Sequence, residues 1–213
     1  MAMQWPSQRA LVSVKNVIVS SYVTEISTQL GLSVAHVEGN TTADLNDEQF
    51  HADLAVIELV PTFGPSALDF LTQIRAAQAR RIPAVLISDH RSPYLVQDDP
   101  PSLRDCSYLV KADITSLEVV RNAIDRAARG LPGIHHNNEQ GIPALTRNQA
   151  ATLRLVASGL SNAQIAIARG RSVRAVELTI ARLYTVLGVD RDRAINSRVA
   201  ATLMYHQSGV TVR

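Results

Sequence analysis

The first 130 residues alternate short apolar runs with amphipathic stretches, and this alternation limits the fold more than any other feature of the chain. Runs that are almost wholly apolar are typical of strands buried on both faces, as in a parallel sheet covered by helices. We therefore predict a doubly wound, flavodoxin-like (βα)5 domain over residues 1–130. Its strands are expected at Val17–Val19, Leu32–Val37, Leu54–Leu59, Pro83–Ile87 and Ser107–Val110.

Helix signals fill the spaces between these predicted strands. Gly31 and Gly130 are stop signals, since glycine readily takes the left-handed conformation that commonly ends a helix. Pro65 is a start signal, because proline is tolerated in the first helical turn. Helices are expected near Val23–Leu30, Asp44–Ala52, Pro65–Arg80 and Thr115–Arg129.

The pattern changes after residue 130. Residues 131–144 hold two prolines, two glycines and a polar cluster without periodicity, and we interpret them as a linker. All later signals are helical. Thr146 and Gln149 have the spacing of a capping box, and Ser172 is a further N-cap. Four helices are expected: one after Thr146, one after Ser161-Asn162, one at Val173–Leu187 and one at Ala194–His206.

The second and third of these helices form a helix-turn-helix pattern. They are joined by the short turn Gly170-Arg171, and basic residues lie on the outer face of the third helix. Its predicted inner stripe consists of Val176, Ile180, Leu183 and Leu187. We predict a four-helix domain over residues 145–213.

Charge is distributed unevenly along the chain. Residues 143–213 hold ten arginines against three acidic residues, a net charge of +7, whereas residues 1–142 carry a net charge of −5. Such a division is expected when one domain binds a polyanion and the other does not. A chance excess on solvated helix faces gives the same count, so charge alone does not decide between the two.

Several function classes lack their sequence signals. Cys106 is the only cysteine, so no internal disulfide can form, and the sequence fits the reducing cytoplasm. The N-terminal residues do not resemble a signal peptide, and no apolar run has the roughly 20 residues that a membrane span requires. There is no glycine-rich phosphate loop, hydrolase motif or metal-ligand cluster. We expect no catalysis, cofactor or metal.

Residues 145–188 resemble the LuxR/NarL-type helix-turn-helix. The matching positions, in register over about 45 residues, are Leu145-Thr146, Leu153–Gly159, Leu160-Ser161-Asn162, Gln164-Ile165-Ala166, Ser172, Val176 and Leu187-Gly188-Val189. The resemblance implies binding to double-stranded DNA. It places Glu177, Leu178 and Ala181 at the family's base-contacting positions, where a lysine is frequent and this chain has an acid and an alanine. The other DNA-facing candidates are Arg169, Arg171, Ser172, Arg174 and Arg182.

The resemblance also implies a homodimer, because a module of this size reads one short half-site. In the family the fourth helix mediates the dimer contact. Its small and apolar side chains here are Ala194, Val199, Ala200 and Leu203.

A five-stranded α/β domain before such a helix-turn-helix resembles a response regulator. Receiver domains hold two acids after strand one, an aspartate at the end of strand three, a hydroxyl after strand four and a lysine after strand five, and together these bind Mg²⁺ and the phosphoryl group. We assign the corresponding positions to Ser20, Ser21, Glu58, Ser88 and Lys111. Only the last two are kept. We therefore expect an atypical regulator with a pseudo-receiver that accepts no phosphate.

Two more features bear on signalling by this domain. Tyr108 lies three residues before Lys111, where receivers carry an aromatic switch residue. The region 92–105 contains Asp98-Asp99-Pro100-Pro101, and paired prolines disfavour a continuous helix there. We expect the usual signalling surface to be remodelled.

The controlling signal stays open between several hypotheses. A Glu58–Lys111 pair could hold an active-like state or merely fill a dead pocket. The cleft above Ser20, Glu58 and Ser88 could bind a small molecule, since ligands favour the carboxyl ends of parallel strands. The domain could instead dimerise or bind a protein partner. A rival function is an adaptor that binds no DNA, and a steep salt dependence of duplex binding would argue against it.

Overall fold

The computed structural model describes residues 9–36, 52–59, 69–96, 100, 106–131, 133–135, 141–189, 196–207 and 209–213. The described residues fall into two compact units. The first, here called the sheet unit, lies within residues 1–88 and 101–137, and the second, the helical unit, lies within residues 89–100 and 138–213. The predicted fold class, a flavodoxin-like α/β domain followed by a helical domain, is confirmed.

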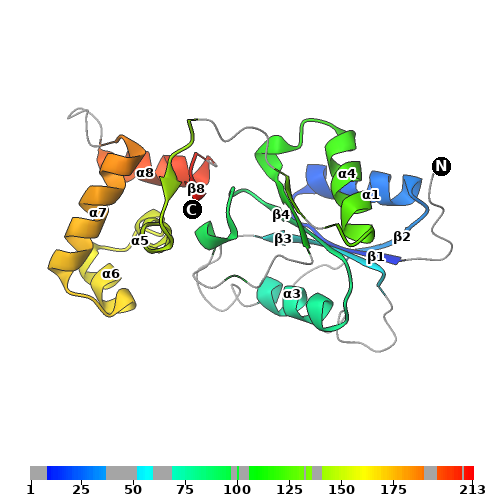
Figure 1. Ribbon diagram of the computed structural model, residues 1–213, viewed down its shortest axis with the longest axis horizontal. Coiled ribbons are helices and arrows are strands. Elements are labelled where there is room, and N and C mark those ends of the chain that lie inside the picture. Colours follow the sequence, from blue (N-terminus) through cyan, green and yellow to red (C-terminus); the bar gives the residue numbers. More distant parts are fainter. Residues whose placement is uncertain are drawn as a thin grey trace. The chain divides into compact units, whose positions relative to one another are not determined.

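The sheet unit is a parallel sheet with helices on both faces (Figure 1). Its strands are β1 (Arg9–Ser13), β2 (Ser33–His36), β3 (Leu54–Leu59), β4 (Ala84–Ser88), β5 (Cys106–Val110) and β6 (Gly133–His135). They lie in the order β2-β1-β3-β4-β5-β6, and every pair is parallel. Figure 1 shows α1 (Val17–Gln29) and α4 (Leu117–Ala128) on one face and α3 (Asp69–Ala79) on the other.

The central strands β3, β4 and β5 are buried along their whole length, as continuous apolar runs predict. The core between the sheet and the α1–α4 layer includes Val23, Val56, Val85 and Ile124. The predicted strands three, four and five agree with the structure to within one residue at each end.

The prediction of strand one at Val17–Val19 is wrong. These residues form the first turn of α1, because the Asn16 side chain accepts a hydrogen bond from the Val19 amide at 3.1 Å and caps the helix. Val17 and Ile18 are 77% and 66% exposed, which a central strand would not allow. The first strand is β1, whose apolar residues Ala10–Val12 are buried.

The interpretation of residues 131–144 as a linker is wrong in part. Gly133–His135 forms β6, which pairs with the outer edge of β5. Pairing at a sheet edge uses backbone groups and needs no apolar run, so the composition of this segment did not indicate a strand. The predicted helix at Asp44–Ala52 lies outside the described residues except for its last residue, and so do Asp98, Asp99, Pro101 and Ala194.

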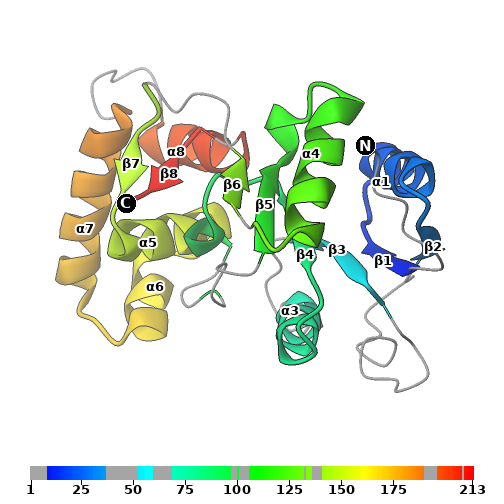
Figure 2. The same cartoon turned by 45° about the vertical axis from the view of Figure 1, so that its right-hand side comes forward.

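The helical unit contains α5 (Arg147–Ala157), α6 (Asn162–Arg169), α7 (Val173–Leu187) and α8 (Ser197–His206). A short parallel ribbon of β7 (Ala144–Leu145) and β8 (Thr211–Val212) completes it (Figure 2). The helix ends follow the predicted signals. Thr146 with Gln149 forms a complete capping box, as does Ser161 with Gln164, and Ser172 caps α7.

Two apolar clusters hold the helices of this unit together. One joins α5, α7 and α8 around Leu153, Leu183 and Tyr205, and the other joins α5, α6 and α7 around Ile165 and Ile180. The predicted inner stripe of α7 is confirmed, since each of its four residues is buried: Val176, Ile180, Leu183 and Leu187.

Candidate functional site

The outer face of α7 is the exposed surface of the helix-turn-helix. Gly170, at φ +58°, ends α6 in the left-handed conformation, and Ser172 starts α7 two residues later by accepting a hydrogen bond from the Ala175 amide at 3.2 Å. Opposite the buried stripe the helix exposes Arg174, Glu177, Leu178, Ala181 and Arg182. These are the predicted DNA-facing residues, and the fold brings them onto one face of one helix.

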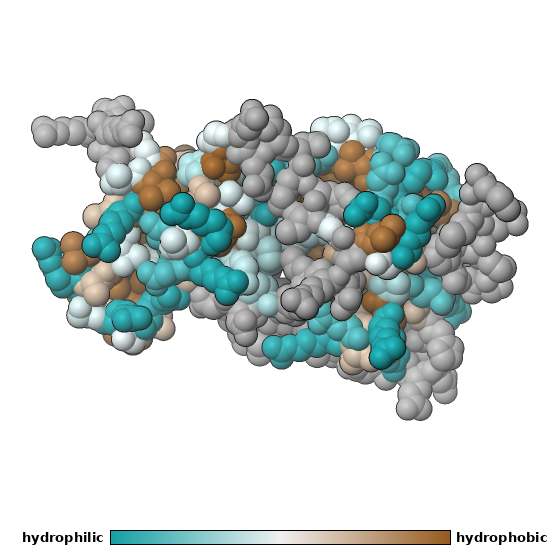
Figure 3. Space-filling model, in the orientation of Figure 1, coloured by the Kyte–Doolittle hydropathy of each residue, from teal (hydrophilic) through white to brown (hydrophobic). Residues whose placement is uncertain are grey.

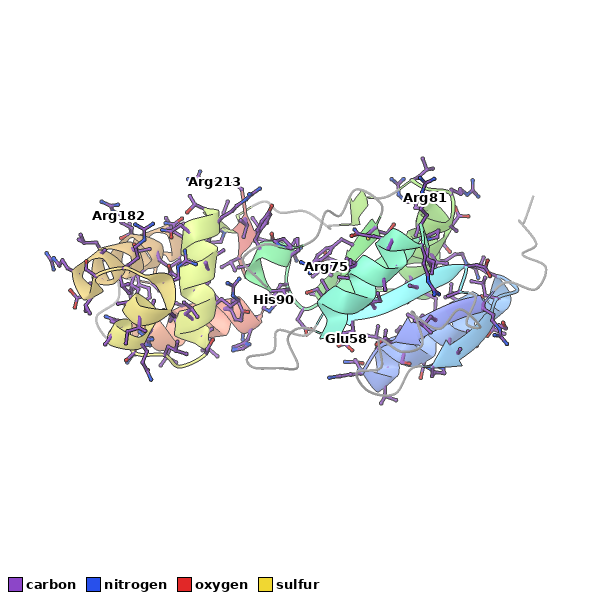
Figure 4. All side chains as sticks on the ribbon, turned by 90° about the horizontal axis from the view of Figure 1, so that it is seen from below. Glu58, Arg75, Arg81, His90, Arg182 and Arg213 are labelled. Atoms are coloured by element: carbon purple, nitrogen blue, oxygen red, sulfur yellow. The ribbon has the colours of Figure 1, made fainter. Side chains whose placement is uncertain are left out.

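The described surface around this helix is mixed in character. Figure 3 shows hydrophilic side chains over much of the helical unit, with hydrophobic patches between them. Leu178 is 45% exposed in the middle of the outer face of α7. Arg182 extends away from the helix, as Figure 4 shows. The face therefore offers cationic groups for phosphates together with an apolar group that can contact a base edge.

Arg174 and Glu177 lie next to each other on this face. The Arg174 Nη1 and Glu177 Oε2 atoms are 3.7 Å apart, and the two side chains are 79% and 46% exposed. An exposed ion pair of this kind contributes little to stability and can rearrange when a ligand arrives.

A hollow of about 210 Å³ lies beside the first half of α7. Arg169 and Arg171 line it, and the Arg169 Nη2 donates to the Asn148 Oδ1 at 2.9 Å. The remaining lining residues are Asn148, Thr152, Ala175, Val176 and Thr179. Sequence reasoning selected the two arginines but missed the polar residues from α5, because only folding places α5 beside α7. The size of the hollow and the two arginines that line it suit a phosphate group.

Arg154 and Arg198 make hydrogen bonds inside the unit. Arg154 is buried, and its Nη1 donates to the Tyr94 carbonyl at 3.1 Å. Arg198 donates to the Leu160 carbonyl and to the Asn162 Oδ1. The net charge of the region therefore overstates the number of cations that can reach a partner.

α8 has an inner and an outer face. Ala201 and Tyr205 are buried in the unit, whereas Val199 and Leu203, one turn apart, are 56% and 52% exposed. Ala200 is half-buried between them. Two exposed large apolar side chains at this spacing are available for contact with another molecule.

The second candidate site lies at the carboxyl end of β3 in the sheet unit. The Glu58 carboxylate pairs with the Lys111 ammonium, and the two side chains are 4% and 15% exposed. The Lys111 ammonium contacts the Oε1 atom of Glu58. The Oε2 atom of Glu58 accepts hydrogen bonds from the Lys15 amide at 2.5 Å and the Asn16 amide at 3.1 Å. Ser88 is buried at the end of β4, next to Leu59 in the sheet register.

The placement of Ser20 and Ser21 at this site is wrong. Both lie within α1, where the Ser21 hydroxyl donates to the Val17 carbonyl at 2.9 Å. The residues that follow β1 are Val14, Lys15 and Asn16. The error comes directly from the misplaced first strand. Glu58 and Lys111 do meet, as one of the hypotheses required, and Lys111 opens a short 3₁₀ turn (Lys111–Asp113) after β5.

Tyr108, the predicted switch residue, is fully buried on β5, where it pairs with Leu86 of β4. Groups of three or more metal-binding side chains do not occur among the described residues. Over the same part of the chain, none of the helices is both long and apolar enough to cross a bilayer.

Comparison with solved structures bears on the fold. A structure of two RcsB dimers bound to two parallel DNAs has a TM-score of 0.53 and 16% identity, covering 94% of this chain and 99% of that chain. RcsB from Salmonella enterica serovar Typhimurium, bound to the promoter rprA in the presence of the phosphomimetic BeF3-, has a TM-score of 0.50 and 16% identity, covering 95% and 100%.

The chain has the RcsB fold. No protein-family model matches it, and no curated protein matches it. Within the RcsB fold, the helix-turn-helix elements are complete, whereas the strand-end site holds a glutamate that is already bound to a lysine and two backbone amides.

Proposed function

We propose that this protein is a transcription regulator that binds double-stranded DNA through α7, as a homodimer, without phosphorylation of the sheet unit. The observation that carries the proposal is the outer face of α7, where cationic and apolar side chains are exposed opposite a fully buried stripe. An α-helix with such a face fits the major groove. RcsB, which has the same fold, is bound to DNA as dimers.

The contacts divide by chemistry. Arg171 and the hollow beside α7 are suited to a backbone phosphate, and Arg182 and Arg174 can reach phosphates or guanine edges. Leu178 suits the methyl group of thymine. Phosphate contacts position the protein, and base contacts supply the sequence preference.

Dimerisation is assigned to the outer face of α8. Val199 and Leu203 form an exposed apolar pair on a helix that is held in place by its inner face. Two copies joined there would bind two half-sites. The test is Leu203→Glu, which is expected to abolish cooperative binding to a two-half-site duplex while single-site binding persists.

The state of Glu58 supports the proposal that the protein acts without phosphorylation. The Glu58 carboxylate accepts from one ammonium and two amides. One of these amides belongs to Lys15, in the segment after β1 where a receiver would hold Mg²⁺ ligands. Incubation with acetyl phosphate is expected to leave the mass and the DNA affinity of the protein unchanged. A covalent phosphate on the wild-type chain would refute this.

The central experiment is selection of binding sites from a random duplex pool by the full-length protein, followed by titrations at several salt concentrations. Arg182→Ala is expected to weaken binding about tenfold and to reduce the salt slope by about one, because one phosphate-facing cation is lost. The matched control is Arg129→Ala, an exposed arginine of the sheet unit, which should bind as the wild type does. Equal binding by the wild type and Arg182→Ala would contradict the proposed interface.

A further inference from the structure

One segment of the chain leaves the sheet and joins the core of the helical unit. Residues Asp89–Val96, here called the strap, follow β4 directly, yet they belong to the helical unit. Leu95 is fully buried in the same apolar cluster as Leu145, Leu153 and Tyr205. A core residue of the helical unit is therefore supplied from a position 52 residues before α5 begins.

Polar contacts also hold the strap. The Tyr205 hydroxyl donates to the Leu95 carbonyl at 2.8 Å, and the Arg154 Nη1 donates to the Tyr94 carbonyl at 3.1 Å. Both donors are side chains with less than a tenth of their surface exposed. Because buried donors need acceptors, the strap carbonyls satisfy polar groups that would otherwise be costly to bury.

Aromatic contacts add a second layer. The Arg147 guanidinium lies 4.2 Å from the centroid of the Tyr94 ring, and the His90 ring lies 4.3 Å from the Tyr205 ring. Arg147 and Arg154 belong to α5, and Tyr205 belongs to α8. The strap thus contacts two helices that are distant in sequence from it and from each other.

The strap has too little structure of its own to hold this shape alone. It contains one 3₁₀ turn, Pro93–Leu95, with hydrogen bonds from the Leu95 amide to the Ser92 carbonyl and from the Val96 amide to the Pro93 carbonyl, each at 3.0 Å. An isolated turn of three residues does not persist in water. Its order therefore depends on docking in the helical unit.

We propose that the strap is a clamp that positions α8 against α5, so that DNA binding requires the strap to be docked. The inference deepens the proposed function and rests on it. α8 carries Val199 and Leu203, the exposed pair assigned to dimerisation, so the clamp sets how that pair is presented. The strap begins one residue after Ser88, so it also joins the end of β4 to the DNA-binding unit without a spacer.

The test is amide hydrogen exchange on the full-length protein, with Leu95→Ala as the main variant. In the wild type, the Leu95 and Val96 amides should exchange about as slowly as those of α8, and at least ~100-fold more slowly than an unfolded chain. Leu95→Ala should accelerate exchange in the strap and at the α5–α8 contact about tenfold or more, because a buried leucine is lost. The amides of β3, β4 and β5 should not change.

Two further variants make the result decisive. Tyr205→Phe keeps the ring and removes only the hydrogen bond to Leu95, and it should accelerate strap exchange about fivefold without unfolding the unit. Leu131→Ala, at an exposed leucine of the sheet unit, is the matched control and should change neither region.

The clamp would be overturned if the amides of the wild-type strap exchanged at the rate of an unfolded chain. It would also be overturned if Leu95→Ala accelerated amide exchange in the strap alone and not at the α5–α8 contact. DNA binding is measured on the same proteins, and Leu95→Ala should weaken it about tenfold. Undiminished DNA binding by a variant whose strap is released would also overturn the clamp. A protected strap in a wild-type protein that binds no duplex would instead refute the proposed function.

Discussion

Two glutamates show how differently the two units use charge. Glu58 of the sheet unit is buried, and its carboxylate is bound to Lys111 and to the amides of Lys15 and Asn16. Glu177 of the helical unit is half exposed and lies 3.7 Å from Arg174 in solvent. The buried carboxylate of Glu58 is held by three internal partners, whereas the exposed carboxylate of Glu177 can exchange Arg174 for a ligand.

The comparison teaches that similarity of fold does not carry chemistry with it. The sheet unit keeps the parallel sheet, and the Glu58 carboxylate at the end of β3 is bound by groups of the same unit. The helical unit keeps its cationic surface available.

Glu58→Gln should lower the free energy of unfolding by about 3 kcal/mol, because it removes one member of a buried ion pair. Urea unfolding followed by circular dichroism measures this change. A loss below about 1 kcal/mol would show that the Glu58–Lys111 pair behaves like an exposed one and would remove the contrast between the units.

Tyr205 makes the stability of the helical unit depend on pH. Burial raises the pKa of its hydroxyl to about 12, and Arg154 lowers that pKa in part. Unfolded tyrosine titrates near 10, so between about pH 10 and 12 the unfolded state loses a proton that the folded state keeps. The free energy of unfolding should therefore be intact below pH 10 and fall by about 2–3 kcal/mol as the pH rises to 12.

This alkaline loss is measured by urea unfolding at a series of pH values, with Tyr205→Phe as the control. The variant cannot ionise at this position, so its stability should decline less over the same window. Parallel curves for the two proteins would mean that the Tyr205 hydroxyl is solvated in the folded state.

Gly170→Ala should lower the free energy of unfolding by about 1 kcal/mol, since a residue with a Cβ is strained in the left-handed conformation. A Cβ at this position meets no atom within 4 Å, so the effect is purely conformational. Thermal unfolding measures it. An unchanged midpoint would indicate that the turn before α7 readjusts freely, which a rigid recognition surface does not allow.

Glu177→Gln should change the free energy of unfolding by less than about 0.5 kcal/mol, because its ion pair is exposed. Its expected effect is on duplex binding: removing a negative charge from the proposed DNA-binding surface of α7 should tighten nonspecific binding. The matched comparison is Glu58→Gln, where the same chemical change acts on stability and not on affinity. Titration at two salt concentrations measures the second effect.

The candidate DNA interface was predictable from the sequence in most of its parts. The caps Thr146–Gln149 and Ser172, the turn at Gly170-Arg171 and the buried stripe of α7 are all local patterns, and the structure places each as predicted. The strand-end site was predictable only in its later members. Glu58 and Ser88 lie at the ends of buried strands and Lys111 follows one, so the strand pattern locates them. The partners from the β1–α1 loop were missed because Val17–Val19 has an apolar run that suits a strand or a helix equally.

Local patterns predict the helix starts and ends and the turns, because their hydrogen bonds span three or four residues, and continuous apolar runs mark the fully buried central strands. Features whose partners are far away in the chain are set by tertiary contacts. The amides that bind Glu58 lie 42 and 43 residues before it, β6 pairs with the outer edge of β5, and the strap supplies Leu95 to a core 50 residues farther on. Short segments have no strong local preference, so the surface on which they dock decides their conformation.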